Sequence, residues 1–277
     1  MQEFQRADLT FDVTDSGPAD GEVVVLLHGY PENRTSWDAV TPHLVEAGFR
    51  VLAPDQRGYS PRARPKGRRA YAMQHLAGDV VALIDAAGAE KAHVVGHDWG
   101  GGVAWALAEF HPERVRTVTS LTTPHPRALA KAMVTGSQAL KSWYMFMFQL
   151  PVVPDLAYRP RMDKRLRETL RSTGLADEAI DRYITPLRQP GAATAAINWY
   201  RAMPFSKRPP GEVSVPALYV YGTRDAFLGR KAADLTGDYV QAPYRYEVLD
   251  GVTHWMPEEI PDVVARLVLE HISHSSG

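Results

Sequence analysis

The sequence contains no cysteine among its 277 residues. This absence excludes disulfides, thiolate metal ligands and a cysteine nucleophile, and it fits a reducing compartment. The first nine residues lack the basic and then apolar pattern of a signal peptide. No apolar run approaches the roughly 20 residues that a membrane-spanning helix needs. We therefore expect a cytoplasmic protein that does not associate with membranes.

The sequence also lacks an excess of charge of either sign, because its formal net charge is −1. No overall field would draw it to nucleic acid or to an acidic surface. The arginine-rich stretch at residues 62–69 contains Pro65 and Gly67 and is typical of a solvated loop. None of the ten histidines forms a pair at zinc-ligand spacing. We expect no nucleic-acid partner, no metal and no cofactor, and either a monomer or a homodimer.

Short apolar runs predict buried parallel strands. These runs are residues 23–28, 50–54, 92–96, 115–121, 217–221 and 246–249, and residues 2–14 predict an antiparallel edge pair. Helical spacing of apolar residues predicts helices at residues 35–47, with Thr35 or Ser36 as N-cap, and at 72–87, 100–110 and 260–272. The alternation of strands and helices predicts an α/β fold with a mostly parallel, doubly wound sheet.

Residues 124–210 interrupt this alternation. They are helical in pattern, rich in aromatic residues and punctuated by prolines, and strands resume at Val215. An insert after the sixth strand would lie over the carboxyl ends of the strands, where open α/β sheets bind ligands. We predict a core domain of residues 1–123 and 211–277 and a helical cap of residues 124–210. The alternative is a helical insert without a functional role.

The run Gly-His-Asp-Trp-Gly-Gly at residues 96–101 lies between a predicted strand and a predicted helix. It has the small-x-nucleophile-x-small pattern of a nucleophile elbow, with Asp98 in the place of the nucleophile. A tight turn needs small residues on both sides, and the helix N-terminus favours negative charge there. The alternative is that Asp98 only caps the helix.

Two further segments complete a possible active site. The loop His-Gly-Tyr-Pro follows the strand at 23–28, so the backbone N–H groups of Tyr30 and Trp99 would form an oxyanion hole. Asp225 ends one late strand and His254 follows the last one. The order nucleophile, acid and histidine matches the α/β-hydrolase fold. Since residues 117–127 contain no acid, Asp225 is the candidate partner of His254.

Together these segments resemble the epoxide hydrolase branch of the α/β hydrolases. The resemblance covers nearly the whole chain and includes the run Asp-Gln-Arg-Gly-Tyr-Ser at residues 55–60. It implies that Asp98 attacks an epoxide to form an ester, which water activated by His254 then hydrolyses. It also implies two cap tyrosines that bind the epoxide oxygen, and the contexts Ser-Trp-Tyr and Asn-Trp-Tyr-Arg assign this role to Tyr144 and Tyr200. The alternative is that both tyrosines only pack within the cap.

The apolar cap segment at residues 143–151 suggests a small, apolar epoxide as substrate. We expect the substrate pocket to include His28, Pro31, Trp143, Phe146, Trp199 and Trp255. A haloalkane dehalogenase remains open as the nearest alternative, since Trp99 with Trp143 or Trp199 offers indole N–H groups to a halide. A catalytically silent ligand-binding protein of the same fold is a further alternative.

Overall fold

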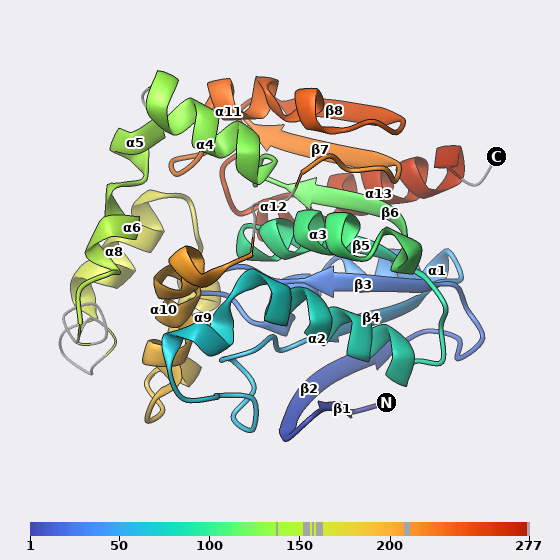
Figure 1. Ribbon diagram of the computed structural model, residues 1–277, viewed down its shortest axis with the longest axis horizontal. Helices are drawn as coiled ribbons and strands as arrows, with labels where there is room; N and C mark the ends of the chain where they lie inside the picture. Colours follow the sequence, from blue (N-terminus) through green and yellow to red (C-terminus); the bar gives the residue numbers. More distant parts are fainter. Residues whose placement is uncertain (137, 152–155, 157, 159–162, 208–210, 276–277) are drawn as a thin grey trace.

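The computed structural model describes residues 1–136, 138–151, 156, 158, 163–207 and 211–275. Its centre is an eight-stranded sheet with the order β1-β2-β4-β3-β5-β6-β7-β8 (Figure 1). The strands are β1 (Glu3–Arg6), β2 (Leu9–Ser16), β3 (Val23–Leu27), β4 (Arg50–Pro54), β5 (Ala92–His97), β6 (Val115–Leu121), β7 (Ala217–Gly222) and β8 (Tyr244–Leu249). The pairs β1–β2 and β2–β4 are antiparallel and all others are parallel. The predicted fold class is confirmed.

Helices cover both faces of this sheet, which explains why β3 and β5 consist of fully buried residues. On one face lie α2 (Met73–Ala86) and α3 (Trp99–Phe110), and on the other lie α1 (Thr41–Glu46) and α13 (Pro261–Ser275) (Figure 1). Short helices α11 (Arg230–Asp234) and α12 (Met256–Glu259) flank β8 in sequence. Two separate hydrophobic clusters form the core, one on each side of the sheet.

One predicted helix is wrong in extent. Residues 35–47 form a 3-10 helix (Arg34–Trp37) and then α1, instead of one continuous helix. The cap of the first is Asn33, whose Oδ1 accepts from the Thr35 N–H at 3.0 Å, so neither Thr35 nor Ser36 is the N-cap. Pro42, the second residue of α1, has no N–H to donate back to Asp38, which favours a new helix start here over one continuous helix.

Among its described residues, the segment between β6 and β7 consists of helices joined by turns and loops. It contains α4 (Pro126–Thr135), α5 (Gln138–Lys141), α6 (Trp143–Met147), α8 (Lys164–Ser172), α9 (Asp177–Leu187) and α10 (Ala192–Ala202). These helices gather at the end of the sheet to which the strand arrows point (Figure 1). The described residues therefore agree with an insert over the carboxyl ends of the strands. The division at residues 124 and 210 stays a prediction, and residue 210 lies outside the described residues.

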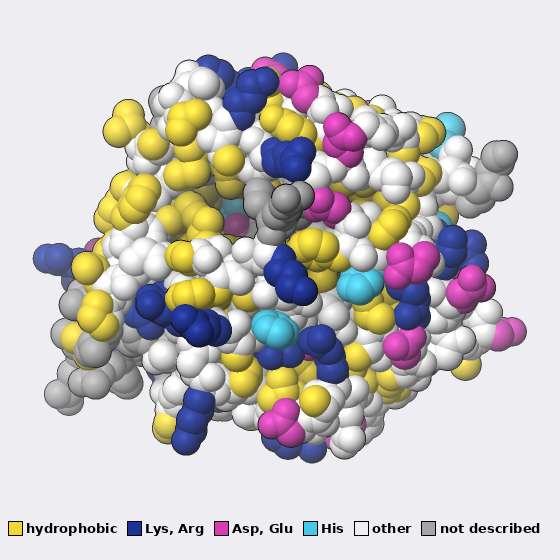
Figure 2. Space-filling model, viewed as in Figure 1, with side chains coloured by type: hydrophobic (Ala, Val, Ile, Leu, Met, Phe, Trp, Pro, Cys, Tyr) yellow, Lys and Arg dark blue, Asp and Glu magenta, His cyan; other side chains and the backbone are white. Residues whose placement is uncertain are grey.

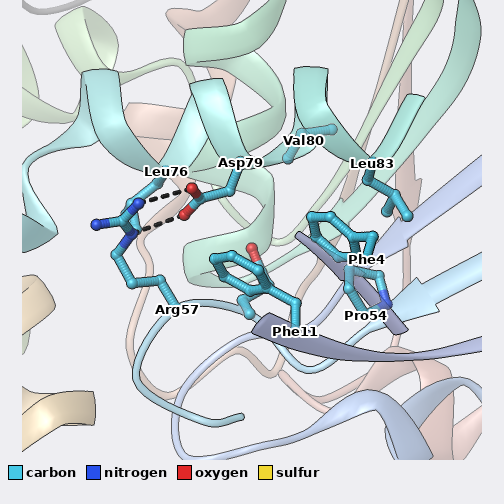
Figure 3. A pocket seen from close by; sticks show the side chains of 9 residues that line it. Phe4, Phe11, Pro54, Arg57, Leu76, Asp79, Val80 and Leu83 are labelled. Atoms are coloured by element: carbon cyan, nitrogen blue, oxygen red, sulfur yellow. Dashed lines mark hydrogen bonds and ion pairs between the residues drawn. The ribbon is translucent and has the colours of Figure 1, made fainter. Parts of the chain in front are cut away.

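The motif at residues 55–60 joins the insert to the core. Arg57 makes a bidentate ion pair with Asp79 of α2, with both N–O distances 2.7 Å (Figure 3). Both side chains are buried, so the pair stays dry and geometrically fixed. The carbonyl oxygen of Arg57 accepts a hydrogen bond from the Trp199 indole of α10 at 2.8 Å. The void beside this pair is only about 10 Å³, which is too small for a substrate.

None of the helices that the structure describes combines the length and the apolar character needed to cross a membrane.

Buried histidine makes the fold sensitive to acid. His125 is fully buried at the start of α4, where its ring stacks on Tyr239 with centroids 5.0 Å apart. Burial, together with the charge of Arg127, lowers the pKa of His125 to about 3. As the pH falls, the imidazole of His125 therefore binds a proton in the unfolded chain before it does so in the folded protein. The free energy of unfolding decreases as the pH drops below about 6.5.

We expect this histidine to cost about 2 kcal/mol of stability near pH 5 relative to neutral pH. The measurement is urea unfolding of the wild type and of His125→Asn at both pH values. Asparagine can still accept the Arg127 N–H at the helix start but cannot titrate. An equal loss of stability in both proteins would contradict the prediction.

Candidate active site

Asp98 stands at a strained turn between β5 and α3. Its φ and ψ are 50° and −121°, which a residue other than glycine adopts only when its surroundings impose it. The flanking glycines make the turn possible. A Cβ on Gly96 would lie 2.1 Å from the Gly100 oxygen, and one on Gly100 would lie 2.0 Å from the Leu27 oxygen. The turn therefore has the tight geometry that the sequence predicts for a nucleophile elbow.

The carboxylate of Asp98 does not cap its own helix, because no side-chain capping bond is present at the start of α3. Instead, Oδ1 accepts the backbone N–H of Tyr30 at 2.8 Å. That N–H comes from the loop after β3, 68 positions earlier in the chain. Between the residues that the structure describes, no hydrogen bond runs from the Trp99 N–H to this carboxylate. The role of Trp99 in an oxyanion hole stays a prediction.

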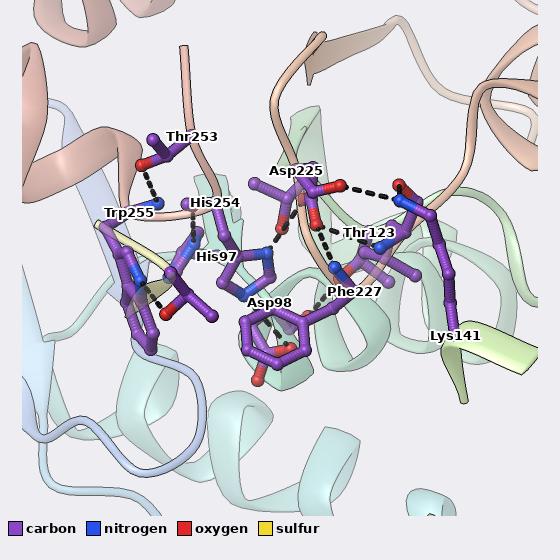
Figure 4. Close-up of polar contacts among 12 residues, drawn as sticks. His97, Asp98, Thr123, Lys141, Asp225, Phe227, Thr253, His254 and Trp255 are labelled. Atoms are coloured by element: carbon purple, nitrogen blue, oxygen red, sulfur yellow. Dashed lines mark hydrogen bonds and ion pairs between the residues drawn. The ribbon is translucent and has the colours of Figure 1, made fainter. Parts of the chain in front are cut away.

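His254 lies between two carboxylates (Figure 4). Its Nδ1 is 2.8 Å from Oδ2 of Asp225, and its Nε2 is 3.6 Å from Oδ2 of Asp98. Burial of the ring disfavours its charge, but the two carboxylates outweigh this and raise the pKa of His254 to about 10. The pKa of Asp98 is lowered overall, because contacts with His254 and the Tyr30 N–H outweigh the effect of burial. The resting site thus holds an imidazolium between two carboxylates.

Asp225 is fixed more firmly than a single hydrogen bond would allow. Its second oxygen, Oδ1, accepts the backbone N–H groups of Phe227 and Leu228 at 2.7 and 2.9 Å. The residue is only 3% exposed. A buried carboxylate with both oxygens hydrogen-bonded keeps its orientation. It can therefore hold the His254 ring in one tautomer, with Nε2 toward Asp98.

A cavity of about 350 Å³ opens over Asp98. Its lining is mostly apolar and includes Leu129, Met133, Met145 and Leu228 from the insert and the core. Figure 2 shows the hollow in this face of the molecule, beside hydrophobic side chains. Such a shape fits a small apolar ligand that reaches one carboxylate at the end of the cavity.

Tyr144 of α6 and Tyr200 of α10 both line this cavity together with Asp98. Their rings lie 6.1 Å apart. Enclosure of the hydroxyl raises the pKa of each above its ordinary value, and the negative charge of Asp98 acts in the same direction. The Tyr200 hydroxyl also has a hydrogen bond with the Trp99 side chain, which lowers its pKa but is outweighed by burial. Both hydroxyls are therefore protonated at neutral pH, and both side chains line the cavity that contains Asp98.

Among the described residues there is no cluster of three or more histidine and acidic side chains with the spacing of a metal site. The chemistry that these residues offer comes from a carboxylate, an imidazole and two phenols.

Known proteins share this arrangement of elements. The sequence profile described as the alpha/beta hydrolase fold matches residues 22–261, which is well over half of the chain. The chain belongs to the α/β-hydrolase family. It is 38% identical over 274 residues to the AB hydrolase superfamily protein YfhM of Bacillus subtilis, covering 96% of this chain and 95% of that protein. The family, together with the epoxide hydrolases among its relatives, identifies the chain as a hydrolase.

The relatives of this α/β hydrolase include epoxide hydrolases, so the resemblance seen in the sequence is confirmed. It is 32% identical over 304 residues to Epoxide hydrolase A of Mycobacterium tuberculosis, covering 94% of this chain and 93% of that protein. The crystal structure of Epoxide Hydrolase A from Mycobacterium thermoresistibile superposes with a TM-score of 0.84 at 28% identity, covering 98% and 97% of the two chains.

The pocket prediction is partly wrong for this α/β hydrolase. Of the six residues expected in the pocket, only Trp199 lines the cavity. Trp143 and Phe146 are 62% and 64% exposed and lie on the outer side of α6, because only one side of so short a helix can face Asp98. The other three, His28, Pro31 and Trp255, are buried behind the site.

Those buried residues support the site from behind. His28 accepts the Gln56 N–H through Nε2 at 3.1 Å, which fixes the loop that presents Tyr30. The Trp255 indole donates to Thr173 Oγ1 of the insert at 3.0 Å and lies edge-on to the His254 ring. Their apolar or aromatic character suggested a pocket, but each is used in packing.

The sequence did not reveal a buried network next to His254. Glu32 and His97 are both fully buried, and Glu32 Oε2 lies 2.8 Å from His97 Nδ1. His97 Nε2 lies 2.8 Å from the backbone oxygen of His254. The same Glu32 oxygen accepts the Gly29 N–H at 2.7 Å. The network thus ties the loop after β3 to the loop that carries His254, and the 65 positions between Glu32 and His97 hid it from a sequence pattern.

Proposed function

We propose that this enzyme hydrolyses an apolar epoxide to a vicinal diol through an ester on Asp98. The observation that carries the proposal is one cavity that Asp98, Tyr144 and Tyr200 line together. A carboxylate attacks an epoxide carbon without prior deprotonation, and the breaking C–O bond needs a proton donor. Named relatives of the chain are epoxide hydrolases, which agrees with this chemistry.

In the first step, an oxygen of Asp98 forms a bond to one epoxide carbon while the bond from that carbon to the ring oxygen breaks. The ring oxygen takes a proton from Tyr144 or Tyr200, and the tyrosinate regains its proton from solvent. The raised pKa of each tyrosine keeps the hydroxyl protonated at neutral pH before the reaction. The product of this step is a hydroxyalkyl ester of Asp98.

In the second step, water hydrolyses the ester at the carboxyl carbon of Asp98. Ester formation removes the negative charge of Asp98, which is one of the two charges that raise the pKa of His254. His254 can then release its proton to solvent and, as neutral imidazole, accept a proton from the attacking water, while Asp225 stabilises the imidazolium. The Tyr30 N–H stabilises the developing oxyanion at Asp98, with Trp99 as the proposed second donor. The proton returns from His254 to the departing alkoxide, which leaves as the diol.

A haloalkane dehalogenase is less well supported, because the indole donors proposed for a halide are largely committed elsewhere. The Trp199 indole donates to Arg57 at 2.8 Å, and Trp143 is 62% exposed outside the cavity. A leaving halide would thus face two hydroxyls and the Trp99 side chain. A leaving alkoxide, by contrast, could take a proton from either of these two hydroxyls.

The function is tested by incubating the purified protein with a panel of aryl and alkyl epoxides and of haloalkanes, with diol and halide measured in parallel. We expect diol from at least one apolar epoxide and no halide. Release of halide without diol would replace the proposal with dehalogenation. Silence on both panels, while a bound epoxide still shifts the melting temperature, would indicate a ligand-binding protein.

The two tyrosines give a separate prediction. Tyr144→Phe or Tyr200→Phe alone should slow ester formation about tenfold to a hundredfold, and the double variant should slow it by at least about a thousandfold. Each substitution removes a proton donor and keeps the ring packing. Rapid-mixing kinetics of ester formation provides the measurement, with Tyr239→Phe, outside the cavity, as a matched control. Normal ester formation in the double variant would require another proton donor.

A further inference from the structure

Lys141, the last residue of α5, lies beside the loop that carries Asp225 (Figure 4). Its ammonium group donates to the backbone oxygen of Asp225 at 2.7 Å and to that of Leu228 at 3.3 Å. Within the described part of the chain, no carboxylate lies within ion-pairing distance of it. Two backbone carbonyl oxygens, and no carboxylate among the described residues, therefore partner this half-buried ammonium group.

Gln138, at the start of the same short helix, forms hydrogen bonds with the other side of the loop of residues 225–229. Its side-chain amide donates to the Phe227 oxygen at 2.9 Å, and its Oε1 accepts the Gly229 N–H at 2.8 Å. Gln138 is only 3% exposed, so these bonds are sheltered from water. Together, Gln138 and Lys141 hold residues 225–229 from the insert side, just before α6 presents Tyr144.

The charged groups that face His254 are few. They are the carboxylates of Asp98 and Asp225 and, through the His97 ring 4.9 Å away, the Glu32–His97 pair. The remaining neighbours are the aromatic rings of Phe227 and Trp255. The ammonium group of Lys141 approaches this group through Asp225, because the carbonyl oxygen that it contacts belongs to the partner of His254.

We propose that Lys141 is a positioning residue for hydrolysis of the Asp98 ester, where its charge favours loss of the proton from His254. The inference rests on the proposed function. In the resting site, two carboxylates face the imidazolium. After esterification only Asp225 keeps its charge, and the ammonium of Lys141 then opposes the positive charge on His254. The charge of Lys141 therefore favours the neutral form of His254 during ester hydrolysis, the step in which His254 must accept a proton from water.

The test compares Lys141→Met, which removes the charge, with Lys141→Arg, which keeps it. Ester formation and ester decay are followed separately by rapid quench and mass spectrometry of the Asp98 peptide across a pH series. In Lys141→Met, we expect the rising limb of ester decay to move up by about one pH unit. Ester formation should change by less than about threefold, and Lys141→Arg should keep the wild-type limb. Lys131→Met, an exposed lysine on α4, should behave as wild type.

Each outcome has a distinct meaning. An unchanged limb in Lys141→Met, or an equal shift in Lys141→Arg, would overturn the inference. If Lys141→Met does not fold, Lys141→Gln keeps a hydrogen-bond donor without charge and gives the same comparison. If wild-type protein forms no ester on Asp98, the proposed function itself fails. If the ester forms and only the pH shift is missing, the proposed function stands and the role of Lys141 does not.

Discussion

Replacement of Asp98 with asparagine should abolish turnover of epoxides, with a loss of at least about ten-thousandfold in kcat/KM. The amide has nearly the shape of the carboxylate, and its oxygen can still accept the Tyr30 N–H that now lies 2.8 Å from Oδ1. What it lacks is the negative charge that attacks the epoxide carbon. The loss therefore reports on nucleophilicity and not on packing.

Diol formation and the mass of the Asp98 peptide are the two measurements. Asp8→Asn, which changes an exposed aspartate in the β1–β2 turn, is the matched control and should retain wild-type rates. Melting temperatures of both variants establish that they are folded. A folded Asp98→Asn protein that still turns over and does not revert to aspartate, as verified by mass spectrometry, would show that another group is the nucleophile.

Replacement of His254 with glutamine should instead stop the enzyme half-way through its cycle. Asp98 is still ionised and the tyrosines are still present, so ester formation should continue, within about tenfold of the wild-type rate. Without an imidazole at the position 3.6 Å from Asp98, no group there can accept a proton from water. Ester decay should fall by at least about a thousandfold.

The expected signal is a burst of epoxide consumption that approaches one molecule per protein chain, followed by almost no turnover. Mass spectrometry should find the substrate mass on the peptide that contains Asp98. His111→Gln, at a partly exposed position just after the end of α3, is the control and should show steady turnover. If His254→Gln hydrolyses the ester at the wild-type rate, the base of the second step is a different residue.

The Asp98 and His254 variants separate the two steps because the negative charge of Asp98 has a role in each step. In the proposed mechanism, Asp98 is the nucleophile of the first step and, as a carboxylate, one of the two groups that raise the pKa of His254 at rest. Esterification converts it to the electrophile and releases the imidazole for base catalysis. The proposed order of events is thus contained in the electrostatics of three side chains.

The three polar residues of the site could be found in the sequence because each follows a strand of the parallel sheet. Asp98 follows β5, Asp225 comes after β7, and His254 comes after β8. Parallel strands end at one edge, so side chains placed just after them converge whatever their separation in the chain. The strands themselves were evident as short apolar runs, since both faces of the sheet must be buried.

The lining of the pocket depended on the tertiary structure. Trp143, Tyr144 and Phe146 are neighbours in one five-residue helix, yet Tyr144 faces the cavity while the other two are more than half exposed. All three are aromatic, so hydrophobicity does not distinguish the inner from the outer side of so short a helix. Packing of α6 against Phe148, Tyr200 and Phe227 sets its rotation about its axis.

The sequence by itself determined the sheet, the elbow at Asp98 and the partnership of Asp225 with His254, because these follow from local apolar patterns and strand ends. Only the tertiary structure decided the rest. The contacts of Lys141 with Asp225 and of Glu32 with His97 join positions 84 and 65 residues apart. Such contacts leave no local pattern in the sequence. A lysine or glutamate whose side chain contacts a distant buried residue cannot be distinguished, from its neighbours in the sequence, from one on the surface. Their role appears only when folding removes water and supplies the partner.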